Sequence, residues 1–169
     1  MSENIQDIAV HTISVYVANK PGVLARIAQV FARRGFNIDS LVVSPSVDGR
    51  YSRMTIAAKG SIRGLEQIIL HVSKLVDVMH CIDHALDEAV VKEMALLKVV
   101  VSAEERTEAL QICEHFKGQT VDLTETSMII LVTGNSNKLD ACIEMMKKFN
   151  VIELTRTGKV LMARGAEVT

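Results

Sequence analysis

The chain has 169 residues and a formal net charge of −1, with 49% hydrophobic and 23% charged residues. These values are typical of globular proteins and exclude a disordered or collagen-like chain. A nearly neutral chain also lacks the basic field that attracts nucleic acid or acidic lipid, and 4% aromatic residues leave little surface for base stacking. We therefore expect neither nucleic acid nor a membrane as a partner.

The apolar segments and the cysteines indicate where the protein works. No uncharged apolar run approaches the roughly 18 residues that cross a bilayer, and residues 1–4 are too polar for a signal peptide. Cys81, Cys113 and Cys142 form no CxxC pair, which indicates free buried thiols in a reducing compartment. We expect a cytoplasmic protein. The mean hydropathy of +0.24 further suggests that some apolar surface is buried against another chain.

The chain opens with a predicted strand and helix. Residues 11–18 alternate apolar and polar side chains, which is typical of a half-buried strand with Thr12, Ser14 and Tyr16 on its wetter face. Pro21 is expected in the first turn of the following helix, and Gly35 is expected to end it in a left-handed conformation. The apolar stripe of this helix consists of Leu24, Ile27, Ala28 and Phe31.

The rest of the first half predicts two strands, a helix and a fourth strand. Residues 36–47 and 51–58 are expected to pair through a hairpin at Asp48-Gly49, where both central positions can take positive φ. A second helix has the apolar stripe Leu65, Ile68, Ile69 and Val72, and residues 76–86 form the last strand. The order βαββαβ predicts two helices on one face of an antiparallel sheet.

The second half repeats this order. Ser102 and Glu105 form a capping box that opens a helix, Gly118 ends this helix, and Asn135 or Ser136 caps the next one. The predicted strands are residues 95–101, 119–123, 127–134 and the extended stretch 151–164, which bends near Gly158. The fold class is therefore α+β, with two ferredoxin-like βαββαβ domains at 1–86 and 90–169.

The loop after the first strand carries the clearest chemistry. Its residues are Asn19, Lys20, Pro21, Gly22, Val23 and Leu24. The first backbone N–H groups of a helix lack intrahelical partners and favour an anion such as a carboxylate, while Gly22 permits close approach of a ligand. Asn19 can orient an ammonium or a carboxylate, and Asn37 is expected near the same spot. The group suits a small zwitterion; the alternative is an ordinary strand–helix turn capped by Asn19 or Lys20.

Several motifs resemble a known family. Residues 10–85 resemble an ACT domain, a small-molecule sensing module of amino-acid metabolism. The runs 19–24, Arg34-Gly35-Phe36-Asn37-Ile38-Asp39-Ser40-Leu41 and Ser52-Arg53-Met54-Thr55-Ile56 are similar to the regulatory (small) subunit of acetolactate synthase, or acetohydroxyacid synthase. Arg156-Thr157-Gly158-Lys159 resembles its second domain. Lys20-Pro21 departs from the acidic or serine residue frequent in relatives, and we expect this departure to tune effector affinity.

The resemblance implies a regulatory function. It implies a homodimer formed through the ACT domains that binds valine, leucine or isoleucine at its interface, with Asn37 and Ile38 supplied by the partner chain. It also implies that the chain activates a large catalytic subunit, confers feedback inhibition on it, and uses its second domain in activation. No catalytic site, metal or cofactor is expected here; thiamine diphosphate, Mg²⁺ and FAD are expected on the catalytic subunit.

Other kinds of site are disfavoured by geometry. On a strand His80 and His84 share a face, whereas Cys81 and Asp83 point the other way, so the four cannot easily bind one metal ion. Cys113 and His115 do not face each other on a helix. Neither a phosphate-binding glycine loop nor a thiamine diphosphate motif is present. The remaining alternatives are an ACT-type sensor that regulates another enzyme or transcription, and a self-contained enzyme.

Overall fold

The computed structural model describes residues 9–84, 89–166 and 168–169. Contacts divide the chain into two compact units, the first comprising Met1–Val90 with Gly158–Thr169 and the second Val91–Thr157. The expected domains, 1–86 and 90–169, differ from these units because the structure groups the end of the chain with the first unit. The order βαββαβ is confirmed in both halves, as is the α+β class.

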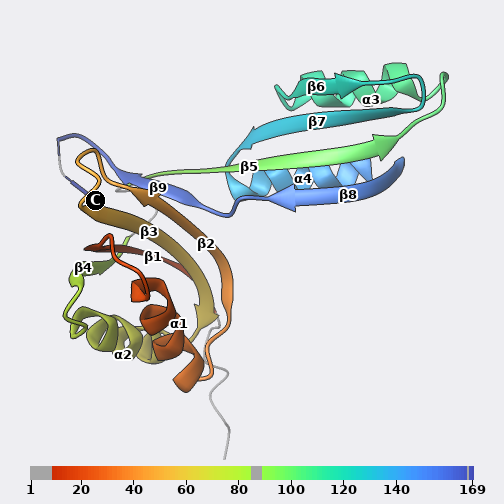
Figure 1. Ribbon diagram of the computed structural model, residues 1–169. Coiled ribbons are helices and arrows are strands. Elements are labelled where there is room, and N and C mark those ends of the chain that lie inside the picture. Colours follow the sequence, from red (N-terminus) through yellow and green to blue (C-terminus); the bar gives the residue numbers. More distant parts are fainter. Residues whose placement is uncertain (1–8, 85–88, 167) are drawn as a thin grey trace, which may run out of the picture. The chain divides into compact units, whose positions relative to one another are not determined.

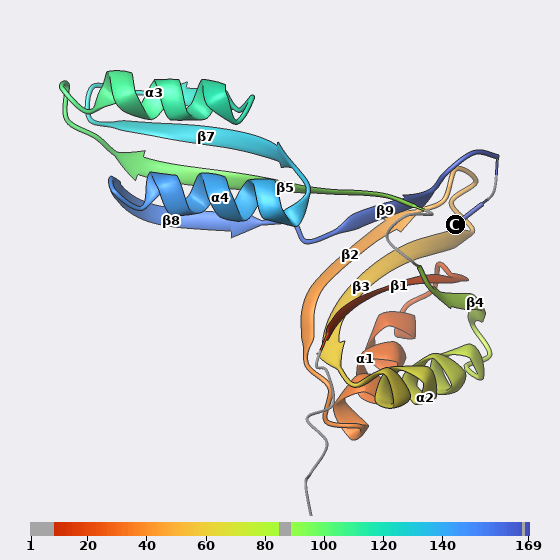
Figure 2. The same cartoon turned by 180° about the vertical axis from the view of Figure 1, so that it is seen from behind.

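The first unit is a four-stranded antiparallel sheet with the strand order β2-β3-β1-β4. Its elements are β1 (Ala9–Ala18), α1 (Val23–Arg33), β2 (Ile38–Pro45), β3 (Tyr51–Gly60), α2 (Ile62–Ser73) and β4 (Val78–Asp83). Both helices cover the same face of this sheet (Figures 1 and 2). The short strand β9 (Val160–Ala163) belongs to the same unit, as do the first two residues of β5, the strand with which β9 pairs.

The core between this sheet and its helices follows the expected periodicity. Every second residue of β1 and β3 faces the helices, and each helix contributes residues at helical spacing. The core residues exposed by 3% or less are Ile13, Val15, Val17, Val23, Ile27, Phe31, Met54, Ile56, Ala58, Leu65, Ile68 and Val72. In the first helix the predicted stripe is confirmed at Ile27 and Phe31, but its first residue is Val23, since Val23 is buried whereas Leu24 is 40% exposed.

The opposite face of β1 is also buried, so the prediction of a half-buried strand was wrong there. Thr12 and Ser14 are 3% and 1% exposed. Ser14 shares a hydrogen bond of 2.6 Å between its Oγ and Nε2 of His84, and Lys159 donates to Thr12 Oγ1 at 3.4 Å. Sequence periodicity missed this burial because these side chains are small and polar, and are satisfied by partners far away in the chain.

The start of α1 differs from the expectation, whereas its end agrees with it. Pro21 precedes the helix instead of occupying its first turn, because Gly22 is the N-cap with φ 83° and ψ −9°. Gly35 follows the helix with φ 70°, as predicted. In the hairpin only Gly49 has positive φ, and after the third helix Lys117, which directly precedes Gly118, is left-handed with φ 52°.

The second unit repeats the arrangement with strand order β6-β7-β5-β8. Its elements are β5 (Ala89–Val100), α3 (Arg106–His115), β6 (Gln119–Leu123), β7 (Ser127–Gly134), α4 (Ser136–Met146) and β8 (Asn150–Arg156). The capping box is confirmed by reciprocal hydrogen bonds between Ser102 and Glu105 at 2.9 and 3.3 Å, and Asn135 caps α4 through Lys138 N. The extended stretch expected at 151–164 forms β8 and β9, and the expected bend near Gly158 lies between them, where Gly158 has a φ of 83°.

A buried carboxylate joins β5 to the end of β8. Glu93 is 5% exposed and accepts hydrogen bonds from the guanidinium of Arg156 at 2.6 and 3.2 Å and from Ser136. Arg156 also binds Asp140 at 2.6 Å. A buried charge is tolerated when it is paired and hydrogen-bonded in this way. Arg156 of the Arg-Thr-Gly-Lys motif thus has a structural task inside the second unit.

The described part of the chain carries neither a membrane-spanning helix nor a metal centre that its side chains would form. None of its helices is both long and apolar enough to cross a bilayer. Within residues 9–84, 89–166 and 168–169, no group of three or more His, Cys, Asp or Glu side chains could hold a metal ion. His84 instead binds Ser14, and Asp83 lies 3.4 Å from His11 Nδ1.

Truncation of Phe31 tests the core of the first unit. Phe31 is 1% exposed, so we expect Phe31→Ala to lower the free energy of unfolding by about 3–5 kcal/mol through lost burial and a residual cavity. Urea denaturation followed by circular dichroism measures this change. Val76→Ala is the control, because Val76 is 92% exposed and its loss should change stability by less than about 0.5 kcal/mol. Equal effects of the two substitutions would contradict the core assignment.

The cysteines provide a second test of packing. Burial raises the pKa of Cys81 to about 12 and that of Cys142 to about 11, and it also raises the pKa of Cys113. Since the thiolate is the reactive form, we expect iodoacetamide at pH 8 to leave all three thiols unmodified in the native protein. In urea all three should react. Rapid alkylation of any of them in the folded state, seen by mass spectrometry, would show that the packing is wrong.

Candidate functional site

The loop from β1 to α1 is held against the hairpin between β2 and β3. The backbone N–H of Asn19 donates to the carbonyl of Arg50 at 2.9 Å, and its side-chain Nδ2 donates to the carbonyl of Gly49 at 3.0 Å. The amide is thereby fixed through its nitrogen, so Oδ1 is the atom that it can offer to a ligand. The sequence therefore identified a polar residue that the fold holds in one orientation.

Gly22 shapes the entry to α1. Its φ of 83° is a conformation that L side chains rarely adopt, and the position that a Cβ would occupy has no neighbouring atom within 4 Å. No side chain caps the helix at this residue. Val23 N donates a long hydrogen bond of 3.5 Å to the carbonyl of Lys20, and Arg26 N donates to the carbonyl of Gly22 at 3.1 Å. The N–H groups of Leu24 and Ala25, which lie between them, therefore remain available to an anion.

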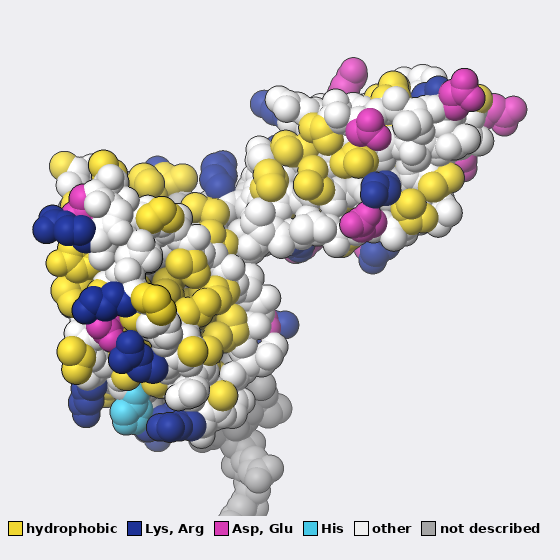
Figure 3. Space-filling model, in the orientation of Figure 1, with side chains coloured by type: hydrophobic (Ala, Val, Ile, Leu, Met, Phe, Trp, Pro, Cys, Tyr) yellow, Lys and Arg dark blue, Asp and Glu magenta, His cyan; other side chains and the backbone are white. Residues whose placement is uncertain are grey.

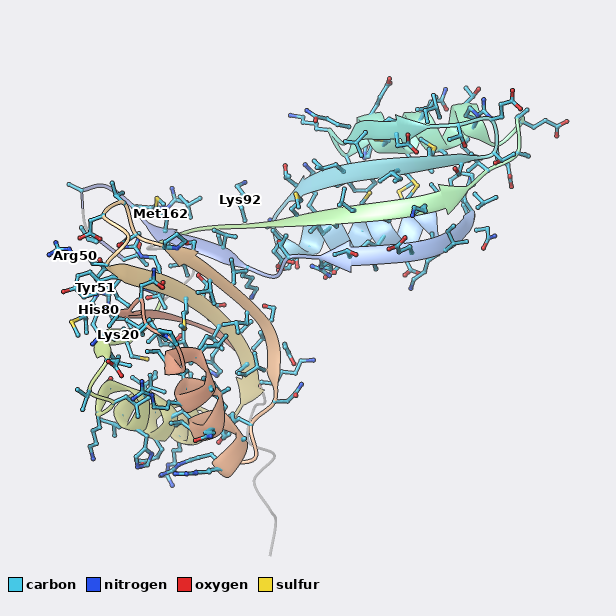
Figure 4. All side chains as sticks on the ribbon, in the orientation of Figure 1. Lys20, Arg50, Tyr51, His80, Lys92 and Met162 are labelled. Carbon is cyan, nitrogen blue, oxygen red and sulfur yellow. The ribbon has the colours of Figure 1, made fainter. Side chains whose placement is uncertain are left out.

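Two cations and one carboxylate surround this helix end. Arg26 Nη2 lies 2.8 Å from Asp77 Oδ2, and Lys20 Nζ lies 3.6 Å from Asp77 Oδ1. The Asp77 side chain is 13% exposed, whereas those of Lys20 and Arg26 are 67% and 51% exposed. Two positive groups share one negative group, and the helix dipole adds further positive potential. Figure 4 shows Lys20 on the same edge of the first unit as Arg50, Tyr51 and His80.

The six loop residues do not contribute in the same way. Val23 is buried in the core, so it can offer a ligand only its backbone. Leu24 is 40% exposed and its side chain can contact a ligand directly. Pro21 and Gly22 set the turn, while Asn19 and Lys20 supply the polar groups.

Asn37 and Ile38 do not approach this loop within one chain, so the expectation that Asn37 comes close to the same spot was wrong. Ala18, at the loop, pairs with Tyr51, whereas Ile38 pairs with Ala58. Ala58 is seven residues further along β3, a separation of about 24 Å at the usual rise of a strand. The antiparallel register thus places the two parts of the predicted site at opposite ends of the sheet.

The structure also assembles a polar cluster that sequence reasoning missed. On the sheet face opposite the helices, the ring of Tyr16 stacks against Tyr51 at 5.1 Å and His80 at 5.3 Å, and Arg53 lies 5.5 Å from its centroid. The signal was present, because alternation along the strands puts Tyr16, Arg53 and His80 on one face. It requires the register of three strands, which a single sequence does not reveal.

Comparisons with known protein families match both halves of the chain. Residues 13–80 match the model of the acetohydroxyacid synthase small subunit-like ACT domain. Residues 92–165 match the model described as the small subunit of acetolactate synthase. The two matches follow each other in the order expected from the resemblance and cover most of the sequence.

Individual proteins agree with the family models. A protein of Archaeoglobus fulgidus named "Probable acetolactate synthase small subunit" is 42% identical over 155 residues, which are 92% of this chain and 97% of the relative. The acetolactate synthase small subunit of Mycobacterium bovis is 37% identical over 155 residues, 92% of either chain. The crystal structure of the acetolactate synthase small subunit from Thermotoga maritima has a TM-score of 0.85 at 39% identity, covering 95% of this chain and all of that one. The chain therefore belongs to the acetolactate synthase small subunit family, a family of regulatory subunits with an ACT domain.

Proposed function

We propose that this protein senses a branched-chain amino acid and transmits its presence to the catalytic subunit of acetolactate synthase. It activates that subunit in the cytoplasm and confers feedback inhibition by valine, leucine or isoleucine. The observation that supports this proposal most strongly is the uncapped end of α1 at Gly22, in a chain of this family. An amino acid carries the two charged groups that such a loop can receive.

The loop offers a partner for each part of the effector. The carboxylate binds the free N–H groups at the start of α1, where Lys20 and Arg26 outnumber Asp77 in charge. The ammonium group binds Oδ1 of Asn19, whose nitrogen is engaged by Gly49. The aliphatic side chain packs against Leu24, which is partly exposed.

The remaining contacts come from a second copy of the chain. Because Asn37 and Ile38 lie at the far end of their own sheet, a homodimer formed through the ACT domains is the arrangement that brings them to the loop of the partner. The apolar side chain of the effector is then enclosed by Leu24 and by Ile38 of the other copy. Binding therefore depends on dimerisation, and the effector stabilises one arrangement of the two ACT domains.

Control of catalysis follows from this linkage. The chain itself supplies no catalytic residue, and thiamine diphosphate, Mg²⁺ and FAD belong to the catalytic subunit in this proposal. If the catalytic subunit binds better to one arrangement of the regulatory dimer, valine shifts that preference. The coupling is reciprocal: the catalytic subunit must change the affinity for valine by the same factor by which valine changes the affinity for the catalytic subunit.

Substitution of Gly22 separates sensing from activation. We expect Gly22→Asp to place a carboxylate where the effector carboxylate binds, so that valine inhibition weakens at least tenfold while the catalytic subunit is still activated. The measurement is acetolactate formation by the reconstituted holoenzyme over a range of valine concentrations. A thermal shift of the isolated chain tests binding directly, because ligand at 100 times its dissociation constant adds about 2.7 kcal/mol of stability.

The chain offers a matched control for backbone strain. Gly165 has φ 73° and, like Gly22, has no atom within 4 Å of an added Cβ. Gly165→Asp introduces the same charge and a similar strain outside the loop, and its valine response should equal that of the unmodified protein. Unchanged inhibition in Gly22→Asp, or equal loss in both variants, would reject the loop as the effector site. Failure to activate any acetolactate synthase catalytic subunit would reject the function itself.

Mixing two variants tests whether each site is shared between copies. Gly22→Asp and Asn37→Ala each damage both sites of a homodimer, so neither variant alone should bind valine tightly. A mixed dimer has one site with both changes and one intact site. We expect co-refolded mixtures to recover tight binding in up to about half of the mixed dimers' sites, measured by calorimetry. No recovery in mixed dimers purified with two affinity tags would contradict the shared site.

A further inference from the structure

A cavity of about 560 Å³ lies on the face of the first unit's sheet opposite the helices. This volume falls within the range of about 300–1,000 Å³ that is usual for small-molecule sites. The cavity is separate from the loop at Gly22, since none of the loop residues 19–24 lines it. The sheet supplies one wall through β1, β2 and β3, and β9 supplies another, in the region where Figure 4 labels Met162.

Most of the wall is aliphatic, with a small polar group at one side. The apolar lining residues are Val42, Pro45, Val47, Val160, Leu161, Met162 and Val168. Tyr16, Arg53 and Thr55 are polar groups that β1 and β3 present to the same space. Figure 3 shows apolar and basic side chains together on the visible face of the first unit. A few directed polar groups within an apolar wall are typical of sites for small organic ligands.

Arg53 is the unusual residue of this wall. It is the third residue of β3, and its Nε is buried without a hydrogen-bond acceptor among the described residues. No acidic side chain within residues 9–84, 89–166 and 168–169 forms an ion pair with it. Its recorded side-chain contact is with the ring of Tyr16 at 5.5 Å. Buried cationic groups normally have an anionic or hydrogen-bonding partner. Arg53 Nε has no such partner among the described residues, and a ligand can supply the missing acceptor.

The carboxylate nearest in the wall is already committed. Asp48 binds Ser46 Oγ at 2.6 Å and Arg50 Nε at 2.7 Å. These two bonds hold the pKa of Asp48 at about 2, so it stays ionised and paired with Arg50 at neutral pH. The charge of Arg53 acts instead on the neighbouring His80. The pKa of His80 is lowered first by burial of its ring and then by the positive charge of Arg53. The positive charge beside the cavity is therefore not neutralised by the cavity's own acidic group.

We propose that this cavity binds a small organic monocarboxylate with a short branched apolar chain, whose carboxylate pairs with Arg53. The tail then lies against Val42, Leu161 and Met162, where burial of its apolar surface stabilises the complex. Arg53 receives the acceptor that it lacks, and its forked guanidinium suits a planar carboxylate. The site differs from the effector loop in using one chain only, so it does not require dimerisation.

The probe for this site is 3-methylbutanoate, titrated into the full chain carrying ¹³C-labelled methionine methyl groups. Binding should move the methyl resonance of Met162, on the cavity wall, to saturation. Met128 and Met146 are fully buried in the second unit, and their resonances should stay fixed. Acetate lacks the tail and 3-methylbutan-1-ol lacks the charge, so both should bind at least tenfold more weakly. Inorganic phosphate, an anion without a tail, should also bind at least tenfold more weakly.

Variants then assign the carboxylate contact. Arg53→Gln removes a charge-assisted hydrogen bond and should weaken binding by about 10- to 100-fold. Arg63→Gln is the control, because it removes the same charge from an exposed residue of α2 that does not line the cavity; its affinity should stay within threefold. Val42→Asp, which introduces a negative charge on the wall, should also weaken binding at least tenfold. This second variant keeps the test open if Arg53→Gln does not fold.

Several results would overturn the proposal. They are no saturable shift of Met162, equal binding of acetate or phosphate, or unchanged affinity in both Arg53→Gln and Val42→Asp. Gly22→Asp separates this site from the effector loop, because it should leave 3-methylbutanoate binding unchanged while it abolishes the valine response. Loss of both ligands in Gly22→Asp would show a single shared site and would reject the second one. If only the valine response is lost, as expected, the saturable shift of the Met162 methyl resonance decides whether the cavity binds 3-methylbutanoate.

Discussion

The antiparallel register of β1 with β3 is the constraint on which the first unit depends. Pairing Ala18 with Tyr51 and Ala9 with Gly60 decides which side chains face the helices and which end of the sheet carries each loop. A shift by one residue would turn Ile13, Val15 and Val17 out of the core. The same register separates Asn19 from Ile38 along the sheet, so a site that uses both residues must be built from two copies. In the proposed effector site, the need for a second copy thus follows from strand pairing.

The two faces of the sheet are buried in different ways. The helix face is closed by aliphatic packing, which needs volume and periodicity but no specific partner. The opposite face carries Thr12, Ser14 and Thr55, all nearly inaccessible, so their hydroxyl groups need defined hydrogen-bond partners. His84 and Lys159 provide two of these partners from distant parts of the chain. Gly158 allows the return of the chain, because a Cβ there would lie 2.4 Å from Cβ of Ser40.

Local sequence patterns predicted the helices and strands well, whereas the relative placement of residues far apart in the chain was predicted poorly. The helix stripes, the capping box at Ser102 and the left-handed Gly35 depend on neighbours within a few residues, which the sequence displays directly. The burial of Ser14, the position of Asn37 and the cluster around Arg53 depend on which strands pair and in what register. Pro21 was expected inside the first turn, but the helix begins two positions later at Val23, because Gly22 takes the left-handed N-cap that the periodicity of the helix cannot reveal. The candidate effector loop could be proposed from the sequence because it is one continuous run.

Charge compensation explains why the two candidate sites should behave differently. At the end of α1, Lys20 and Arg26 share Asp77, so an incoming carboxylate meets a partly neutralised, solvent-exposed group and gains much of its affinity from the backbone N–H groups. Arg53 has no such acid, and the surrounding wall is apolar, so a carboxylate there gains a stronger electrostatic interaction at the cost of more desolvation. The first site, with its contacts divided between two chains as proposed, suits an effector whose binding is read out through a second copy. The second favours a ligand whose tail can offset that desolvation, which is why the branched chain matters as much as the charge.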